Sequence, residues 1–208
     1  MPNNVLCRIV IMAKAPAAGL CKTRLIPALG PEGAARLAAR MLQHTVKTAL
    51  DAHIGPVEIC AAPSASHPAW RPLELPANLQ WSEQGEGDLG ARMVAAVQRT
   101  LARGENVMLI GTDCPGLCAA SLQTAAQALA THDAVLVPTA DGGYALIALA
   151  RLHAGIFENM PWSTPTVAQE TLARFARDGW RVQLGPVLHD IDEPADLAHL
   201  PPTLRAVM

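Results

Sequence analysis

The sequence has little of several features that point directly to a function. Only 16% of its 208 residues are charged and 3% are aromatic, and Lys and Arg together (16) do not outnumber Asp and Glu (18). A chain without a net positive charge lacks the field that attracts extended nucleic acid, so we expect no nucleic-acid partner. The high apolar content of 50%, combined with this low charge, excludes intrinsic disorder.

Long hydrophobic runs, paired cysteines and internal repeats are also missing. The first apolar run ends at Ala13, which makes it too short to span a bilayer, and no basic segment precedes it. We therefore expect no membrane partner. The five cysteines form no Cys-x-x-Cys pair and no zinc spacing, which indicates reduced thiols in a cytoplasmic protein. The length favours a single domain over residues 1–208.

Strand-like and helix-like segments alternate along the chain. Short apolar runs predict strands over 6–12, 57–62, 79–82, 107–110, 134–137, 144–150 and 181–184. Amphipathic segments predict helices over 31–52, 88–103, 119–131, 164–178 and 193–200. This alternation indicates an α/β protein with a mostly parallel sheet covered on both faces. Such sheets bind ligands outside the carboxyl ends of their strands, here the loops after Met12, Ile110, Val137 and Leu188.

The loop after the first predicted strand carries three cations. Lys14, Lys22 and Arg24 flank Gly19, whose backbone allows a close approach to a ligand. Converging Lys and Arg side chains suit a polyphosphate, although a solvated basic loop is the alternative. The spacing is neither that of a Walker P-loop nor Gly-x-Gly-x-x-Gly.

Carboxylates follow two other predicted strands. Asp113 comes directly after a buried strand and could hold Mg²⁺, or could cap the helix that begins near Cys118. Asp190 and Asp192 precede the final predicted helix, where they could cap it or complete a metal site with Asp113 through the fold.

Three further segments allow both a structural and a ligand-binding interpretation. Gly87, Asp88 and Gly90 could form a loop that meets a base or sugar, or Asp88 could be a helix N-cap. The run from Asp141 to Tyr144 could approach a ligand or form a tight turn. Trp162 could close over a ligand, while the residues after it could cap a helix.

Six ordered motifs together resemble a known family. They are Lys-x-Pro-x-x-Gly-x-x-Lys-Thr-Arg-Leu, Gly-Asp-Leu-Gly-x-Arg-Met, Gly-Thr-Asp-Cys-Pro, Asp-Gly-Gly-Tyr, Trp-Ser-Thr and Asp-Ile-Asp-x-Pro-x-Asp-Leu. In this order they resemble the DUF2064 family, also called radical-SAM/selenodomain-associated transferase 1. The resemblance implies the three-layer α/β/α GT-A fold of the nucleotide-diphospho-sugar transferase superfamily.

The resemblance also implies roles for individual residues. Lys14, Gly19, Lys22 and Arg24 would bind the nucleotide phosphates, with Lys22 and Asp113 as catalytic residues. Asp113 and Asp192 would hold Mg²⁺ or Mn²⁺, with Asp190 as a weaker candidate ligand. The remaining assignments place Gly87, Asp88 and Gly90 near the nucleotide, and Asp141, Gly142, Gly143, Tyr144 and Trp162 near the acceptor.

The reaction expected from this charge placement is metal-dependent nucleotidyl transfer. An acceptor phosphate or hydroxyl would attack the α-phosphorus of a nucleoside triphosphate and release pyrophosphate. A glycosyltransferase with a nucleotide-sugar donor is the alternative, and a non-catalytic nucleotide-binding module is a third possibility from another class. The partners expected are a nucleotide or nucleotide sugar, a small-molecule acceptor and a second copy of the chain in a homodimer, the commonest oligomer.

Overall fold

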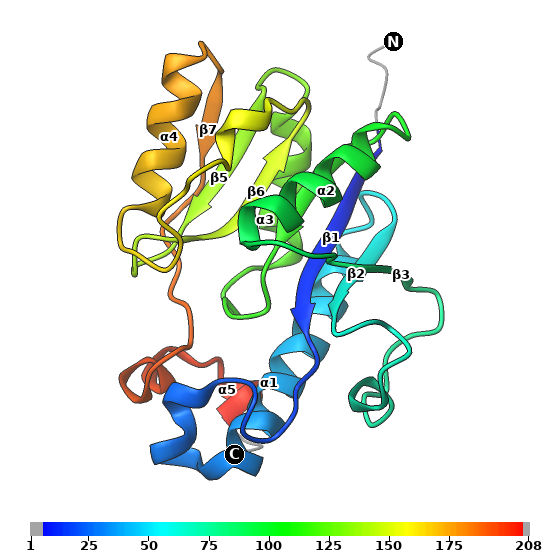
Figure 1. The fold of residues 1–208 in the computed structure, drawn as a ribbon, viewed down its shortest axis with the longest axis vertical. Helices are drawn as coiled ribbons and strands as arrows, with labels where there is room; N and C mark the ends of the chain where they lie inside the picture. Colours follow the sequence, from blue (N-terminus) through cyan, green and yellow to red (C-terminus); the bar gives the residue numbers. More distant parts are fainter. Residues whose placement is uncertain (1–5, 206–208) are drawn as a thin grey trace.

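The computed structural model describes residues 6–205, with one seven-stranded sheet at its centre. The strands are β1 (Cys7–Lys14), β2 (Val57–Ala62), β3 (Gln80–Glu83), β4 (Asn106–Ile110), β5 (Ala134–Pro138), β6 (Tyr144–Leu149) and β7 (Val182–Leu184). The sheet order is β3-β2-β1-β4-β6-β5-β7. Only β6 runs against its neighbours, so the other six strands end at one edge of the sheet (Figure 1).

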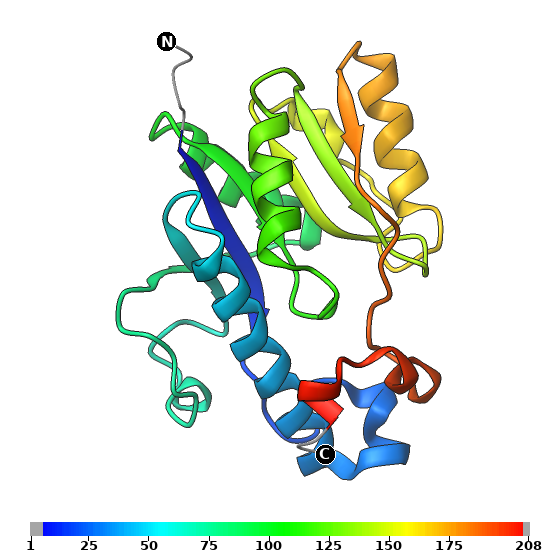
Figure 2. The same ribbon diagram turned by 180° about the vertical axis from the view of Figure 1, so that it is seen from behind.

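Helices cover both faces of this sheet, as the alternating pattern predicts. They are α1 (Ile26–Asp51), α2 (Leu89–Leu101), α3 (Ala119–Ala128), α4 (Val167–Arg177) and the short α5 (Pro202–Arg205). Short 3-10 turns are η1 (Thr23–Leu25), η2 (Pro68–Trp70), η3 (Ala154–Ile156) and η4 (Pro194–His199). Helices α1 and α3 pack on one face (Figure 2), and α2 and α4 pack on the other. The three-layer α/β/α prediction is therefore confirmed.

Side-chain alternation in the strands divides the core into two clusters. In β1, Ile9 and Ile11 point toward α1 and α3, whereas Val10 lies between them in the chain and points toward α2 and α4. All three side chains are fully buried. Because β1 is held in place by this burial, the loop that follows it, residues 15–22, begins at a defined position at the edge of the sheet.

A third core cluster ties the end of the chain to the start of α1. Leu25, Leu37 and Met41 pack against Ile191 and Leu200. Figures 1 and 2 show this last segment beside η1 and the beginning of α1, beyond the carboxyl ends of the strands. The cluster therefore brings residues 190–200 to the loop that follows β1.

Several predicted boundaries shift by a few residues. The helix expected over 31–52 is preceded by a turn of helix that begins at Ile26 and is joined to it through a kink at Gly30 (φ 68°), directly before Pro31. The helix expected from residue 164 begins at Val167. The final predicted helix is the 3-10 turn η4. Leu188 forms an isolated parallel bridge with Thr139 and is not part of a strand.

Buried charges lie near the amino ends of the strands, away from that edge. Glu58 accepts hydrogen bonds from Arg99 (2.6 Å) and Ser82 (2.5 Å), and Arg8 lies 3.4 Å from it. Arg8 also donates to Glu105 at 2.6 Å. Each buried charge is thus paired and hydrogen-bonded, as burial requires.

No helix in the described part of the chain is long and apolar enough to cross a membrane.

Candidate active site

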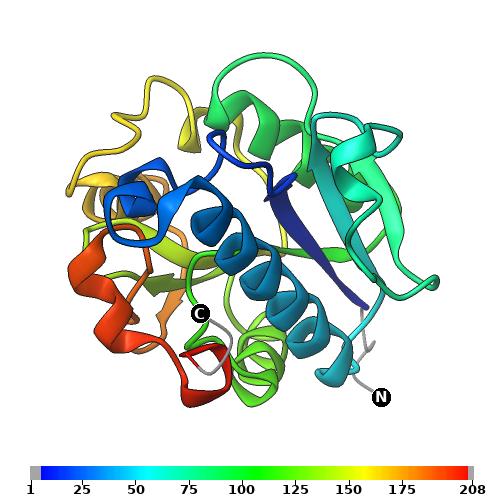
Figure 3. The same cartoon turned by 90° about the horizontal axis from the view of Figure 1, so that it is seen from below.

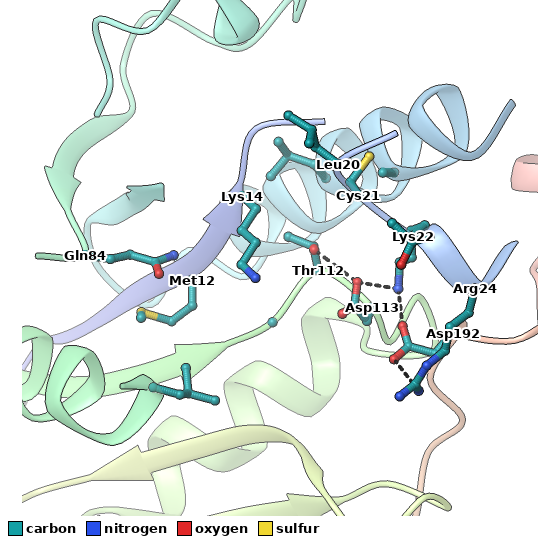
Figure 4. A pocket seen from close by; sticks show the side chains of 15 residues that line it. Met12, Lys14, Leu20, Cys21, Lys22, Arg24, Gln84, Thr112, Asp113 and Asp192 are labelled. Carbon is teal, nitrogen blue, oxygen red and sulfur yellow. Dashed lines mark hydrogen bonds and ion pairs between the residues drawn. The ribbon is translucent and has the colours of Figure 1, made fainter. Parts of the chain in front are cut away.

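A pocket of about 370 Å³ opens at the carboxyl edge of the sheet. Its walls are the loop after β1, the loop after β4 and the segment that precedes η4 (Figure 4). Figure 3 views the molecule from this end and shows the first loop and the last segment meeting there. This is the place that the strand-end rule predicts for a ligand.

Lys22 is the centre of the polar side chains in this pocket. Its ammonium donates to Asp113 Oδ1 (2.7 Å), Asp192 Oδ1 (2.7 Å) and the carbonyl oxygen of Ile191 (2.6 Å). An ammonium has three N–H groups, so these three acceptors satisfy it completely. Two carboxylates that are distant in sequence thus share one cation.

The backbone of Lys22 is in an unusual conformation. Its φ of 47° and ψ of 43° lie in the left-handed region, which costs a residue with a side chain about 1 kcal/mol or more. Burial alone would lower the pKa of Lys22, but Asp113 and Asp192 outweigh it and raise the pKa above its usual value. Lys22 is therefore a charged ammonium throughout the neutral pH range.

The two acids are positioned by the main chain as well as by Lys22. The backbone N–H of Ile191 donates to the carbonyl oxygen of Asp113 at 2.9 Å. The Ile191 side chain is fully buried in the cluster beside α1. Asp192 is consequently held next to Asp113 and the loop after β4, although the two acids are far apart in the sequence.

Neither acid serves as a helix cap. At the start of α3, the Cys118 backbone N–H donates to Ser121, in a capping box formed by those two residues. At the start of η4, Glu193 is the N-cap and Asp196 accepts its backbone N–H. Capping by Asp113 or Asp192, the alternative in the sequence analysis, is excluded, and their carboxylates face the pocket.

The other two cations of the first loop, Lys14 and Arg24, are more exposed than Lys22 and form no ion pair with Asp113. Lys14 ends β1, is exposed, and extends toward the pocket (Figure 4). No ion pair within residues 6–205 includes it. Arg24 lies 4.0 Å from Asp192 and from Glu193 at the outer rim. Gly19 has a φ of 77° and open space around its Cα, so the loop is shaped by a residue without a side chain.

Pocket residues that sequence reasoning did not single out are mostly neutral. Met12, Leu20 and Leu89 provide apolar walls, and Thr112 donates to Asp113 Oδ1 at 3.3 Å. Each of these residues lies within two positions of a motif residue, and this nearness is the feature of the sequence that could have identified them. Ile191 contributes through its carbonyl oxygen, and a side-chain pattern carries no signal for that.

All three predicted nucleotide-binding positions at the start of α2 have a structural role. Asp88 caps α2 by accepting the Ala91 N–H at 2.8 Å. Gly90 is packed so closely that a Cβ would lie 2.6 Å from the Phe157 carbonyl oxygen. Gly87 has a φ of 93° and shapes the turn. A nucleotide contact for these residues stays a prediction.

The predicted acceptor residues divide into two groups. Asp141 accepts from Thr139 Oγ1 (2.5 Å) and the Gly143 N–H (3.0 Å), and a Cβ on Gly142 would overlap Pro165. The segment before Asp190 is joined to the one before Asp141, because the Ala140 N–H donates to the Leu188 carbonyl oxygen at 2.9 Å. Burial, and after it the negative charge of Asp141, raises the pKa of Asp190. These acids follow β5 and precede η4, at the same edge of the sheet as the pocket.

The side chains of Tyr144 and Trp162 pack against the core on the α2 side of the sheet. The Tyr144 hydroxyl lies 3.9 Å from Met93 Sδ in the core between α2 and the sheet. Trp162 stacks on Phe157 with ring centroids 6.4 Å apart. An acceptor contact for either side chain stays a prediction.

The donor set at Lys22 fits a hard divalent cation. Two carboxylates and one carbonyl oxygen converge on a single point, and oxygen ligands are those that Mg²⁺ and Mn²⁺ prefer. Within the described residues no group of three or more His, Cys, Asp or Glu side chains could hold a metal. A cation here would therefore depend on substrate phosphates and water for its remaining ligands, as Mg²⁺ sites commonly do.

Solved structures share this fold. A protein from Desulfovibrio desulfuricans G20, provisionally assigned as a nucleotide-diphospho-sugar transferase, is 29% identical with a TM-score of 0.87, over 95% of this chain and 87% of its own. A nucleotidyl transferase from Methanothermobacter thermautotrophicus is 17% identical with a TM-score of 0.61, over 98% and 99% of the two chains. Rv0371c from Mycobacterium tuberculosis H37Rv, in complex with manganese, is 15% identical with a TM-score of 0.54, over 94% and 97%.

All three neighbours agree with the predicted fold. The 29% identical neighbour also agrees with the predicted enzyme class, a transferase. No curated protein matches the sequence. The model of the family described as "Uncharacterized protein conserved in bacteria (DUF2064)" matches residues 45–164, which is more than half of the chain. The chain therefore belongs to the DUF2064 family, as its six motifs predict.

Proposed function

We propose that this protein is a metal-dependent nucleotidyltransferase that uses a nucleoside triphosphate and releases pyrophosphate. The observation that carries the proposal is the meeting of Lys22 with Asp113 and Asp192 at 2.7 Å each, in a pocket that also holds Lys14 and Arg24. Three cations and two acids at one strand edge are suited to a bound metal–polyphosphate. We further propose that one domain carries the whole site.

The cations would bind the phosphates. The Lys14 ammonium extends toward the pocket and has no ion-pair partner among residues 6–205, and Arg24 stands at the rim with its guanidinium exposed. A triphosphate carries more negative charge than the diphosphate of a nucleotide sugar, so three cations favour the triphosphate. Charge that develops on the transferring phosphoryl group would be stabilised by these fixed cations.

Asp113 and Asp192 would hold the divalent cation, for which a neighbour's manganese complex is a precedent in the same fold. When bound, such a cation supplies Lewis-acid stabilisation of phosphate oxygens. Met12, Leu20 and Leu89 would form the apolar part of the pocket wall beside the nucleotide. The acceptor would approach from the side of Asp141 and Asp190, whose carboxylates could accept hydrogen bonds from its hydroxyl groups.

Glycosyl transfer from a nucleotide sugar is the second candidate. The observation in its favour is the likeness, at a TM-score of 0.87, to a protein provisionally assigned as a nucleotide-diphospho-sugar transferase. Against it, the loop after β4 offers only Asp113 and no second acid within Gly111–Asp113.

One experiment separates these functions. Nucleoside triphosphates and nucleotide sugars are screened by thermal shift, with and without Mg²⁺ or Mn²⁺, and the best ligand is assayed against a panel of acceptors. Release of pyrophosphate supports nucleotidyl transfer, and release of a nucleoside diphosphate supports glycosyl transfer. Stabilisation without any product would instead indicate a nucleotide-binding module.

A further inference from the structure

The ammonium of Lys22 fills the position that a divalent cation needs. Its three hydrogen bonds end on Asp113 Oδ1, Asp192 Oδ1 and the Ile191 carbonyl oxygen, all within 2.7 Å. These are the three oxygen atoms that converge on one point in the pocket. A metal ion bound by them would have to displace Nζ, because both cations need the same oxygens.

The oxygens would stay together without Lys22. Ile191 donates its N–H to the Asp113 carbonyl at 2.9 Å, and its side chain is fully buried beside Leu25 and Met41. These contacts involve no part of the Lys22 side chain. Removal of the ammonium would therefore leave two carboxylates close together with their charges unbalanced, which favours a replacement cation.

The Lys22 ammonium also has an alternative position, inside the pocket itself. Its side chain is long and flexible, and the pocket that it borders is lined by Lys14 and Arg24, the other candidate phosphate ligands. Phosphate oxygens arriving in this pocket would offer the ammonium new acceptors. The same event would free the two carboxylates for the metal that accompanies the phosphates.

We propose that Lys22 is a built-in counter-ion that occupies the metal position until a metal–polyphosphate displaces it, so that free divalent metal binds weakly. This inference rests on the proposed function for the identity of the displacing ligand. Its direct consequence is independent of that ligand: the resting protein discriminates against a divalent cation that arrives alone. Lys22 thereby couples metal binding to nucleotide binding.

The test measures binding of Mn²⁺ alone, by electron paramagnetic resonance and calorimetry, to the wild type and to Lys22→Met. Lys22→Met is expected to bind Mn²⁺ at least about tenfold more tightly, because the competing cation is gone. Lys14→Met is the matched control, since it removes the same charge from the same pocket without touching the two acids. Its affinity should stay within about threefold of the wild type, because an exposed charge is screened.

Two results would overturn the proposal. One is a Lys22→Met protein that binds Mn²⁺ no better than the wild type, which would make Lys22 a scaffold for the metal site. The other is an equal gain in Lys22→Met and Lys14→Met, which would show an effect of net charge alone.

Folding of the variant is part of the same test. Lys22→Gln keeps a polar side chain without charge and should behave like Lys22→Met. If either variant is destabilised, 1 mM Mn²⁺ should raise its melting temperature by several degrees more than it raises that of the wild type. Equal shifts would contradict the proposal. Failure of every nucleotide to bind the wild type would instead reject the proposed function, and the Mn²⁺ comparison would still decide the role of Lys22.

Discussion

The backbone N–H of Ile191 donates to the carbonyl oxygen of Asp113, so the last segment of the chain is joined to the loop after β4 by a main-chain hydrogen bond at 2.9 Å. A substitution of the Asp113 side chain leaves this bond in place. The chemistry of the carboxylate can thus be removed with little change in the surrounding structure.

Asp113→Asn should lower the turnover of the proposed reaction by roughly 10²-fold or more, because one of the two metal carboxylates is lost. The melting temperature should stay close to that of the wild type. The measurement is pyrophosphate release over a range of Mg²⁺ concentrations. Asp51→Asn is the control, since Asp51 pairs with Lys47 on the exposed face of α1 and is not among the residues that line the pocket. An unchanged rate with unchanged Mg²⁺ dependence would reject the assignment of Asp113.

Glu58→Gln should reduce the free energy of unfolding at pH 7 by about 3 kcal/mol, because Arg8 and Arg99 lose a buried anionic partner. Burial alone would raise the pKa of Glu58, but hydrogen bonds from Ser82 and Arg99 and the positive charges of Arg99 and Arg8 lower it overall. The stabilisation is therefore complete above the unfolded pKa of about 4.3 and is lost as the pH falls through the lower folded pKa.

Urea unfolding at pH 7 and in steps below pH 4.5 checks both parts of this prediction. The difference between wild type and Glu58→Gln should narrow as the pH falls. A constant difference across the series would show that the charge of Glu58 does not matter to stability.

Gly142→Ala should destabilise the protein by about 2 kcal/mol or more. Gly142 has a φ of 89°, and a Cβ there would overlap the backbone of Pro165. Gly111→Ala is the matched control, because a Cβ at Gly111 meets no atom of the described residues within 4 Å. Thermal unfolding of both variants should show a clear loss for Gly142→Ala alone, and similar melting temperatures would contradict the packing described.

Asp88→Ala should lower the free energy of unfolding by about 1 kcal/mol through the loss of the cap on α2, and Asp88→Ser should recover most of it. Because the carboxylate is engaged with the Ala91 N–H, Asp88→Ser should also bind nucleotide like the wild type. A stable Asp88→Ser protein with weakened nucleotide binding would instead support a direct contact between Asp88 and the ligand.

The sequence predicts the layers of this fold well because they depend on local periodicity. The strands around Ile9 and Leu109 are short apolar runs between amphipathic helices, and the carboxyl-edge rule then places Lys14, Lys22 and Asp113 near one another. The start of the main helix at Pro31 is also predictable, since proline is common at the first helical position; the turn of helix before Gly30 is not.

The contacts within the site depend on tertiary structure and carry no local signal. Asp113 and Asp192 each fit a helix cap in sequence, but Cys118 and Glu193 hold those positions in the structure. The pairing of Lys22 with both acids requires the left-handed backbone at Lys22 and the packing of Ile191, neither of which a pattern of residue types specifies. For the same reason the buried partners of Glu58 could not be foreseen.

The order of the chain has a consequence for its synthesis. Lys22 precedes Asp192 by 170 positions. At ribosomal rates of roughly 5–20 residues per second, the ammonium is exposed for about ten seconds or more before its second carboxylate exists. The strands that form the sheet have all been made by Leu184, so the sheet can assemble ahead of the site. The pair of carboxylates that binds Lys22 is therefore complete only after every strand of the sheet has been made.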